Sequence, residues 1–227
     1  MNIQSNAQWM TIQVADIHTR EVRQIVPSYQ YLRIWAMGWS ADNSQITFVA
    51  MKTPSLNYTF YRVNRDGGDF HELDCTLSSG GTDQMTNFMF APGGERVAFT
   101  AKAGQTFNIF VLDLMDCNRT QISDGDPYDD LPVWSADGGQ IAFLSGRDGQ
   151  QDIYVMDVDG KHVSRVTHTP DNEILLSWSP DGCCLLYVSY PAGGGFTVYH
   201  YADLRDSSLH PLDPHLERAQ SLPAWGP

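Results

Sequence analysis

A repeated unit of aromatic residue, turn and strand runs through the whole chain and constrains its fold more than any other feature. The unit starts with an aromatic and a small residue, passes through a turn and ends in a short apolar strand, as in Trp134-Ser-Ala-Asp-Gly-Gly-Gln-Ile-Ala-Phe143. Complete units are 44 to 51 residues long, and their aromatic anchors are Trp39, Phe90, Trp134, Trp178 and a last, cut-off copy at Trp225. Repeats of this length are typical of folds in which neighbouring units stack to bury their faces.

Each unit has the pattern of four short strands. In the third unit, Asp-Gly turns separate the anchor, the apolar segment 141–145 and the β-rich segment 152–157, and residues 163–167 close the unit. No segment keeps an apolar period of 3.6 residues, so we expect little or no helix. The pattern predicts an all-β fold, a β-propeller of four-stranded blades, with the anchor aromatics packed between blades.

The two ends of the chain together supply about one more blade. Strands over 1–5, 9–16 and 21–26 would be completed by a C-terminal strand over 222–226, which would close five blades into a single domain over residues 1–227. The alternative is an arc of a longer propeller, because the last anchor stops where its Asp-Gly turn should follow.

The third and fourth units resemble the TolB-type propeller repeat, which also builds the propellers of tricorn-like and prolyl oligopeptidase-like proteases. The resemblance is carried by the anchor turn, by Ser145-Gly-Arg-Asp-Gly149, by Asp152-Ile-Tyr-Val-Met-Asp157 and by Arg165-Val-Thr167. The first unit departs from it with an insert over 52–58. The resemblance implies that Arg147, Asp148, Asp152 and Asp157 hold turns and strand ends together. It also implies an extracytoplasmic location, although the N-terminus as written has no secretory leader.

Several function classes conflict with the sequence. The formal net charge of −13 argues against binding a nucleic-acid backbone. No apolar run reaches the length of about 20 residues that a membrane-spanning helix needs. A serine hydrolase of the kind linked to such propellers needs a Gly-x-Ser-x-Gly elbow, and this motif is missing.

An acidic loop precedes the third anchor and is a candidate cation site. Ser123-Asp-Gly-Asp-Pro-Tyr-Asp-Asp130 contains carboxylates of the kind that bind Ca²⁺, and we name Asp124, Asp126 and Asp129 as the candidate ligands. The loop lacks the glycine and the terminal glutamate of an EF-hand. The alternative is a solvated loop in which the aspartates cap turn amides.

The segments that lead into the anchor strands are candidates for partner binding. The innermost strand of a blade lines the central channel, so loops before these strands would form an acidic, amide-bearing rim at the channel mouth. The candidate binding residues on this rim are Asn87, Tyr128, Asp129, Asp130, Asp171 and Glu173.

The four cysteines leave the redox compartment open. Cys183 and Cys184 are adjacent and not easily bridged, and we expect buried or idle thiols at all four cysteines. The alternative is a bond between Cys75 and Cys117, which would join neighbouring blades.

These observations predict a non-enzymatic, TolB-like propeller that binds a protein partner through its channel-mouth loops, without nucleic-acid binding or membrane insertion. One alternative is a propeller that binds a metal or a small polar ligand and has hydrolase or lyase activity at the channel, with Asp129, Asp130 and Glu173 as acid, base or ligands. A further alternative is that this set of blades is an accessory subunit of a larger assembly.

Overall fold

The computed structural model describes residues 10–29, 32–52, 57–78, 85–124, 128–191 and 197–212. These residues form strands, turns and loops, and none of them belongs to a helix that could cross a membrane. A two-stranded N-terminal sheet holds β1 (Met10–Ala15) and β2 (Val22–Tyr29). Four antiparallel four-stranded sheets follow, and we number them as blades 1 to 4.

The strands of each blade follow one another in the sequence and pair in that order. Blade 1 holds β3 (Leu32–Trp39), β4 (Gln45–Lys52), β5 (Asn57–Asn64) and β6 (His71–Leu77). Blade 2 holds β7 (Met85–Phe90), β8 (Arg96–Ala103), β9 (Thr106–Asp113) and β10 (Arg119–Gln121). Blade 3 holds β11 (Asp129–Trp134), β12 (Gln140–Ser145), β13 (Asp152–Asp157) and β14 (Ser164–Arg165). Blade 4 holds β15 (Asn172–Trp178), β16 (Cys184–Tyr190), β17 (Val198–Asp203) and β18 (Ser208–Pro211).

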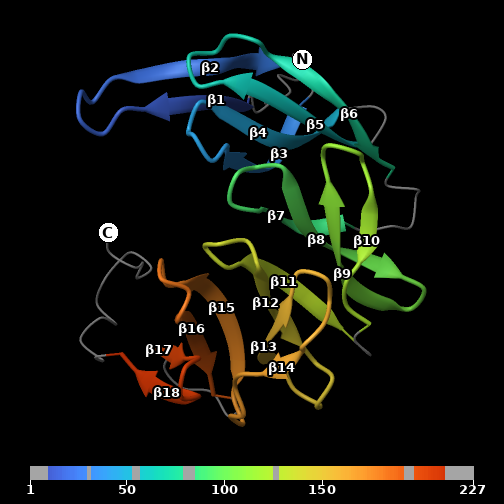
Figure 1. The fold of residues 1–227 in the computed structure, drawn as a ribbon, viewed down its shortest axis with the longest axis vertical. Helices are drawn as coiled ribbons and strands as arrows, with labels where there is room; N and C mark the ends of the chain where they lie inside the picture. The colour runs from blue at the N-terminus through green and yellow to red at the C-terminus, as the bar shows by residue number, and fades with distance from the viewer. Residues whose placement is uncertain are drawn as a thin grey trace, which may run out of the picture.

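The blades fan around a common axis, with their first strands innermost and their fourth strands outermost (Figure 1). The N-terminal sheet and blade 4 lie at the two ends of the resulting arc. This arrangement confirms the all-β propeller of four-stranded blades. The strands expected over 1–5 and 222–226 lie outside the described residues, so closure into five blades stays a prediction.

The Ser-x-Asp sequence after three of the anchors forms the tight turn between the first two strands. In blade 3, Ser135 Oγ donates a hydrogen bond to Asp137 at 2.6 Å and accepts one from the Gln140 N–H at 2.9 Å. The hydrogen bond from Ser135 lowers the pKa of Asp137, because it stabilises the charged carboxylate. The same pair recurs as Ser40–Asp42 in blade 1 and Ser179–Asp181 in blade 4.

The anchor tryptophans of blades 3 and 4 join each blade to the preceding one. Trp134 Nε1 donates to the Met89 carbonyl and Trp178 Nε1 to the Val133 carbonyl, each at 3.0 Å, and both rings are buried. The expectation that every anchor packs between blades is wrong for Trp39, which is 42% exposed. Among the described residues, the sheet preceding Trp39 has two strands and no innermost strand to cover the ring. Trp225 lies outside the described residues.

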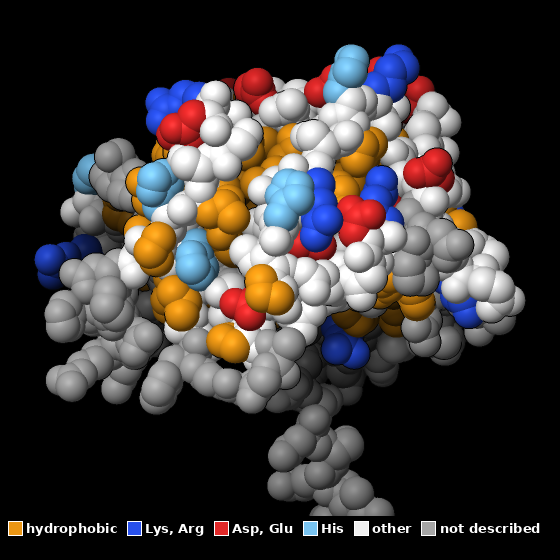
Figure 2. Space-filling model, turned by 90° about the horizontal axis from the view of Figure 1, so that it is seen from below, with side chains coloured by type: hydrophobic (Ala, Val, Ile, Leu, Met, Phe, Trp, Pro, Cys, Tyr) orange, Lys and Arg blue, Asp and Glu red, His pale blue; other side chains and the backbone are white. Residues whose placement is uncertain are grey.

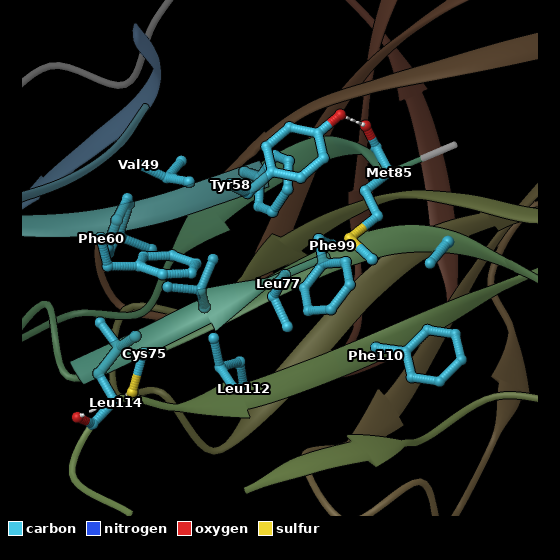
Figure 3. Packing of buried hydrophobic residues seen from close by; sticks show 14 residues of the cluster. Val49, Tyr58, Phe60, Cys75, Leu77, Met85, Phe99, Phe110, Leu112 and Leu114 are labelled. Carbon is cyan, nitrogen blue, oxygen red and sulfur yellow. Dashed lines mark hydrogen bonds between the residues drawn. The ribbon is translucent and has the colours of Figure 1, made fainter. Parts of the chain in front are cut away.

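Aromatic and aliphatic side chains fill the space between neighbouring blades. Between blades 1 and 2, Phe60, Leu77 and Phe99 belong to one buried cluster, and Tyr58 OH donates to the Met85 carbonyl at 2.9 Å (Figure 3). Separate buried clusters lie in the same way between blades 2 and 3 and between blades 3 and 4, so each blade is packed against the next.

The far face of blade 4 carries aromatic side chains that no described blade covers. Leu175 and Tyr187 point toward blade 3, whereas Ile174 on the opposite face is 38% exposed and Tyr201 stacks on His210 with ring centroids 4.7 Å apart. Figure 2, which looks from the end where blades 3 and 4 lie, shows hydrophobic and histidine side chains gathered together, with charges of both signs spread around them.

Candidate functional site

Each innermost strand has a β-bulge, at which one extra residue of this strand lies opposite the second strand, and the bulge changes which side chains face the axis. The register with the second strand shifts between Ile34 and Ala36 in blade 1 and between Leu175 and Ser177 in blade 4. In blades 2 and 3 the shift brings Asn87 and Leu131 into the left-handed backbone region, with φ of 54° and 52°. Bulges of this kind redirect side chains and are frequent beside functional sites.

Large apolar side chains lie exposed along the innermost strands. Met37 on β3 is 52% exposed and Met89 on β7 is 41% exposed. Together with Trp39 and Val133 they line a shallow hollow of about 420 Å³ between the first three blades. We call the exposed side of β3, β7 and β11 the axial surface. Exposed methionine and tryptophan side chains that gather in this way mark interaction sites.

Sequence reasoning missed this apolar part of the axial surface. The signal was present in Trp35-Ala-Met37-Gly-Trp39, where large apolar residues alternate with small ones. In a strand, this alternation places all the large side chains on one face and the small ones on the other. The small residues allow close packing, since a Cβ on Gly38 would lie 2.5 Å from Phe90 Cβ.

Three of the predicted binding residues meet in one hydrogen-bonded group, which we call the Asp130 cluster. Asn87 Nδ2 and Thr100 Oγ1 each donate to Asp130 Oδ1 at 2.6 Å, and Tyr128 OH donates to Asp130 Oδ2. Burial, together with the Asp130 carboxylate, raises the pKa of Tyr128, so the phenol remains a donor. The cluster joins blade 2 to blade 3, and Asn87 at its edge is exposed.

Asp129 does not belong to an exposed acidic rim. The sequence placed it in a loop, but it begins β11 and is fully buried. Arg147 Nη2 lies 3.1 Å from Asp129 Oδ2, and Arg147 Nε donates to Ser145 Oγ at 2.8 Å. The Arg147 guanidinium also lies over the Tyr154 ring. Asp129 is therefore held inside blade 3, and Arg147 has the structural role that the family resemblance implied.

Glu173 is also buried, within β15, which corrects its placement on the rim. Thr167 Oγ1 donates to Glu173 Oε2 at 3.3 Å and Thr169 Oγ1 donates to Glu173 Oε1. Burial raises the pKa of Glu173 to about 7, and the Asp152 carboxylate contributes to the rise. A substrate could reach neither Glu173 nor Asp129 without movement of the blades, which argues against their use as an acid–base pair.

The raised pKa of Glu173 predicts a pH dependence of stability. Ionisation of a carboxyl group whose pKa is raised in the folded state destabilises that state. The free energy of unfolding therefore falls as the pH rises from about 4.5 to about 7, and it does not fall further above pH 7 through this group. We expect Glu173→Gln to raise the free energy of unfolding by on the order of 2–3 kcal/mol at pH 8 and to change it little at pH 4. Urea unfolding at both pH values measures this. The exposed Glu95→Gln variant is the control, and an equal effect of Glu173→Gln at both pH values would contradict the assignment.

The remaining predicted residues lie apart from the axial surface. Asp171 is half-buried in the bend before β15, and Asp124 is exposed after β10. Within the described ranges, no three His, Cys, Asp or Glu side chains gather as metal ligands. Asp126 lies outside the described residues, so the calcium site stays a prediction, and the Arg147 guanidinium beside Asp129 would compete with a cation there.

Comparison with known proteins points to one family. A family model described as TolB beta propeller domain (PD40) matches residues 2–227. The uncharacterized protein Atu1656 of Agrobacterium fabrum is 32% identical over 122 residues, which cover 51% of this chain and 42% of that protein. The chain therefore spans less than half the length of this relative.

Solved structures share the fold at low sequence identity. TolB from Acinetobacter baumannii superposes with a TM-score of 0.67 at 21% identity, covering 90% of this chain and 49% of that one. An oligogalacturonate lyase from Vibrio parahaemolyticus has a TM-score of 0.69 at 12% identity, covering 89% of this chain and 59% of the lyase. At such identities the likeness is one of fold, and function has to be argued from the site.

Proposed function

Because the chain belongs to the TolB beta propeller domain family, we propose that it is a non-enzymatic interaction module whose axial surface binds a segment of a protein partner. The observation that carries this proposal is the pair of exposed methionines, Met37 and Met89, that line the hollow between the first three blades. Methionine side chains adapt to different apolar partners, and Asn87, exposed two residues before Met89 on β7, adds a polar group that can fix the orientation of a ligand.

The charge and shape of the axial surface limit the kind of partner that fits. An extended segment with apolar side chains would fill the hollow between β3, β7 and β11. The net charge of −13 repels an acidic segment, attracts a basic one and leaves a neutral one unaffected. We therefore propose an extended, apolar and non-acidic peptide segment of another protein as the ligand.

The arrangement of hydroxyls and imidazoles supports a non-enzymatic role. Among the described residues, two serine hydroxyls lie close to an imidazole: Ser208 Oγ is 2.7 Å from His210 Nε2, and Ser189 Oγ is 2.9 Å from His200 Nε2. The Ser208 hydroxyl donates its proton to the Asp206 carboxylate at 2.5 Å, so His210 does not act as its base. Ser189 is only 4% exposed, and the His200 imidazole stacks on the Tyr187 ring. Burial lowers the pKa of His200, but a substrate in solution does not reach the Ser189 hydroxyl.

The Cys75–Cys117 disulfide supports an extracytoplasmic location for this module. It joins β6 of blade 1 to the turn after β9 of blade 2. Disulfides persist in oxidising compartments and are rare in the cytosol.

A peptide selection tests the proposed function. Random peptides displayed on phage are selected on the immobilised chain, and enriched peptides are then measured by fluorescence anisotropy. We expect Met37→Glu/Met89→Glu to weaken binding about tenfold or more, because the new carboxylates would have to be desolvated against the peptide. The control is Met115→Glu, since Met115 is 71% exposed in the β9–β10 turn, away from the axial surface. Equal affinity of all three proteins, or no enriched peptide, would overturn the proposal.

A further inference from the structure

Two adjacent cysteines occupy the turn that leads into β16, where the fold does not require sulfur. Cys183 and Cys184 correspond to Ser44–Gln45 in blade 1, Glu95–Arg96 in blade 2 and Gly139–Gln140 in blade 3. The turn uses the backbone of both cysteines, since Cys184 N–H donates to Ser179 Oγ and Leu204 N–H donates to the Cys183 carbonyl. Three equivalent turns form without a thiol, so the side chains of this pair are free for another role.

The turn brings the two sulfur atoms together. Cys183 Sγ lies 2.8 Å from Cys184 Sγ, whereas a disulfide bond is about 2.05 Å long. Less than about 1 Å of movement therefore separates the two thiols from a covalent bond. Both cysteines are free, and the chain's disulfide lies elsewhere, between blades 1 and 2.

We propose that Cys183 and Cys184 form a redox pair that interconverts between a dithiol and a vicinal disulfide. The oxidant is a low-molecular-weight disulfide. One thiolate attacks it and forms a mixed disulfide with release of one thiol, and the second thiolate then displaces the other thiol. The pair loses two electrons and two protons, and the oxidant becomes two thiols. This site is independent of peptide binding on the axial surface.

Exposure decides which cysteine attacks first. Cys183 is half-buried, whereas Cys184 is 7% exposed, so an oxidant in solution reaches Cys183. Burial, together with the neighbouring Cys183, raises the pKa of Cys184, which makes Cys184 the poorer initial nucleophile. The charged groups around the pair are the Asp181 and Asp203 carboxylates and the Arg205 guanidinium, which is paired with Asp203.

The spacing of adjacent residues makes this disulfide easy to reduce. Consecutive Cα atoms are about 3.8 Å apart, below the range of about 4.4–6.8 Å usual for disulfides. The Cα atoms of Cys75 and Cys117 are 5.5 Å apart, within that range. Strained disulfides are the labile ones, so mild reduction is expected to open the vicinal bond and leave the Cys75–Cys117 bond intact.

Oxidation of the folded chain followed by mass spectrometry tests the proposal. The chain is incubated with oxidised glutathione, free thiols are blocked with iodoacetamide, and the tryptic peptide 166–205, which contains only these two cysteines, is analysed. We expect this peptide to lose two hydrogens and to regain them with reduced glutathione. The Cys183→Ser and Cys184→Ser variants should instead carry a glutathione adduct or remain open to alkylation. A wild-type peptide that stays alkylated, keeps a glutathione adduct or links two chains would overturn the proposal.

Discussion

Arg147→Met is expected to lower the free energy of unfolding by about 3–5 kcal/mol. The substitution removes the guanidinium that lies 3.1 Å from the fully buried Asp129 carboxylate, and it also removes the hydrogen bond to Ser145. A buried carboxylate that loses its cationic partner keeps its desolvation penalty without the compensating attraction. Urea unfolding of the two proteins at neutral pH measures the loss.

The double variant Asp129→Asn/Arg147→Met separates this effect from a simple loss of packing. Because the double variant has no buried charge at residue 129, we expect it to recover a large part of the lost stability. The matched control is Lys161→Met, which removes an exposed ion pair with Asp159 and should change stability little. If Arg147→Met were no more destabilising than Lys161→Met, Asp129 would not be held by a buried ion pair.

Replacing both bridged cysteines, as Cys75→Ser/Cys117→Ser, is expected to lower the free energy of unfolding by about 4 kcal/mol. The disulfide closes a loop of 42 residues, and the chain-entropy model gives a value of this size for such a loop. Cys75 belongs to the buried core between blades 1 and 2, so the bond also holds the outer parts of these blades together. Unfolding in urea without reductant measures the change.

The other cysteine pair gives the control for this measurement. Cys183→Ser/Cys184→Ser leaves the Cys75–Cys117 bond in place, and a bond between adjacent residues would close almost no loop, so we expect its midpoint of unfolding to stay close to that of the wild type. Equal loss of stability in both double variants would contradict a specific contribution of the Cys75–Cys117 bond.

The order and pairing of the strands followed from the sequence, because local signals determine them. Asp-Gly turns fix the hairpins, and the expected segments 141–145 and 152–157 match β12 and β13 within one residue. The expected strand over 9–16 of the N-terminal unit matches β1 within one residue, whereas the expected strand over 21–26 ends three residues before β2 does.

The first strands were harder to predict, because their features depend on neighbouring blades. The sequence placed Asp129 and Glu173 in loops, but pairing with β12 and β16 extends the innermost strands over both residues. The partners that keep Asp129 buried come from the turn after β12, 18 residues away. The sequence around Asp129 gives no sign of this contact. Acidic residues in a segment without a predicted strand partner are expected to be exposed to solvent.

The candidate site was predicted in part. The grouping of Asn87, Tyr128 and Asp130 followed from aligning the repeats, which placed these residues at one end of neighbouring innermost strands. The methionines of the axial surface were missed, because an apolar residue in a strand is usually assigned to the core. Only the exposure of Met37 and Met89 in the folded chain distinguishes them from core residues.

Methyl NMR of the chain with labelled methionines tests the central claim most directly. A peptide from the selection is added stepwise, and the methyl signals of Met37, Met89 and Met115 are followed after assignment by Met→Leu variants. Binding on the axial surface predicts that the Met37 and Met89 signals shift with the peptide concentration while the Met115 signal stays in place. Shifts at Met115 with unchanged Met37 and Met89 signals would contradict the account and place binding on the outer strands.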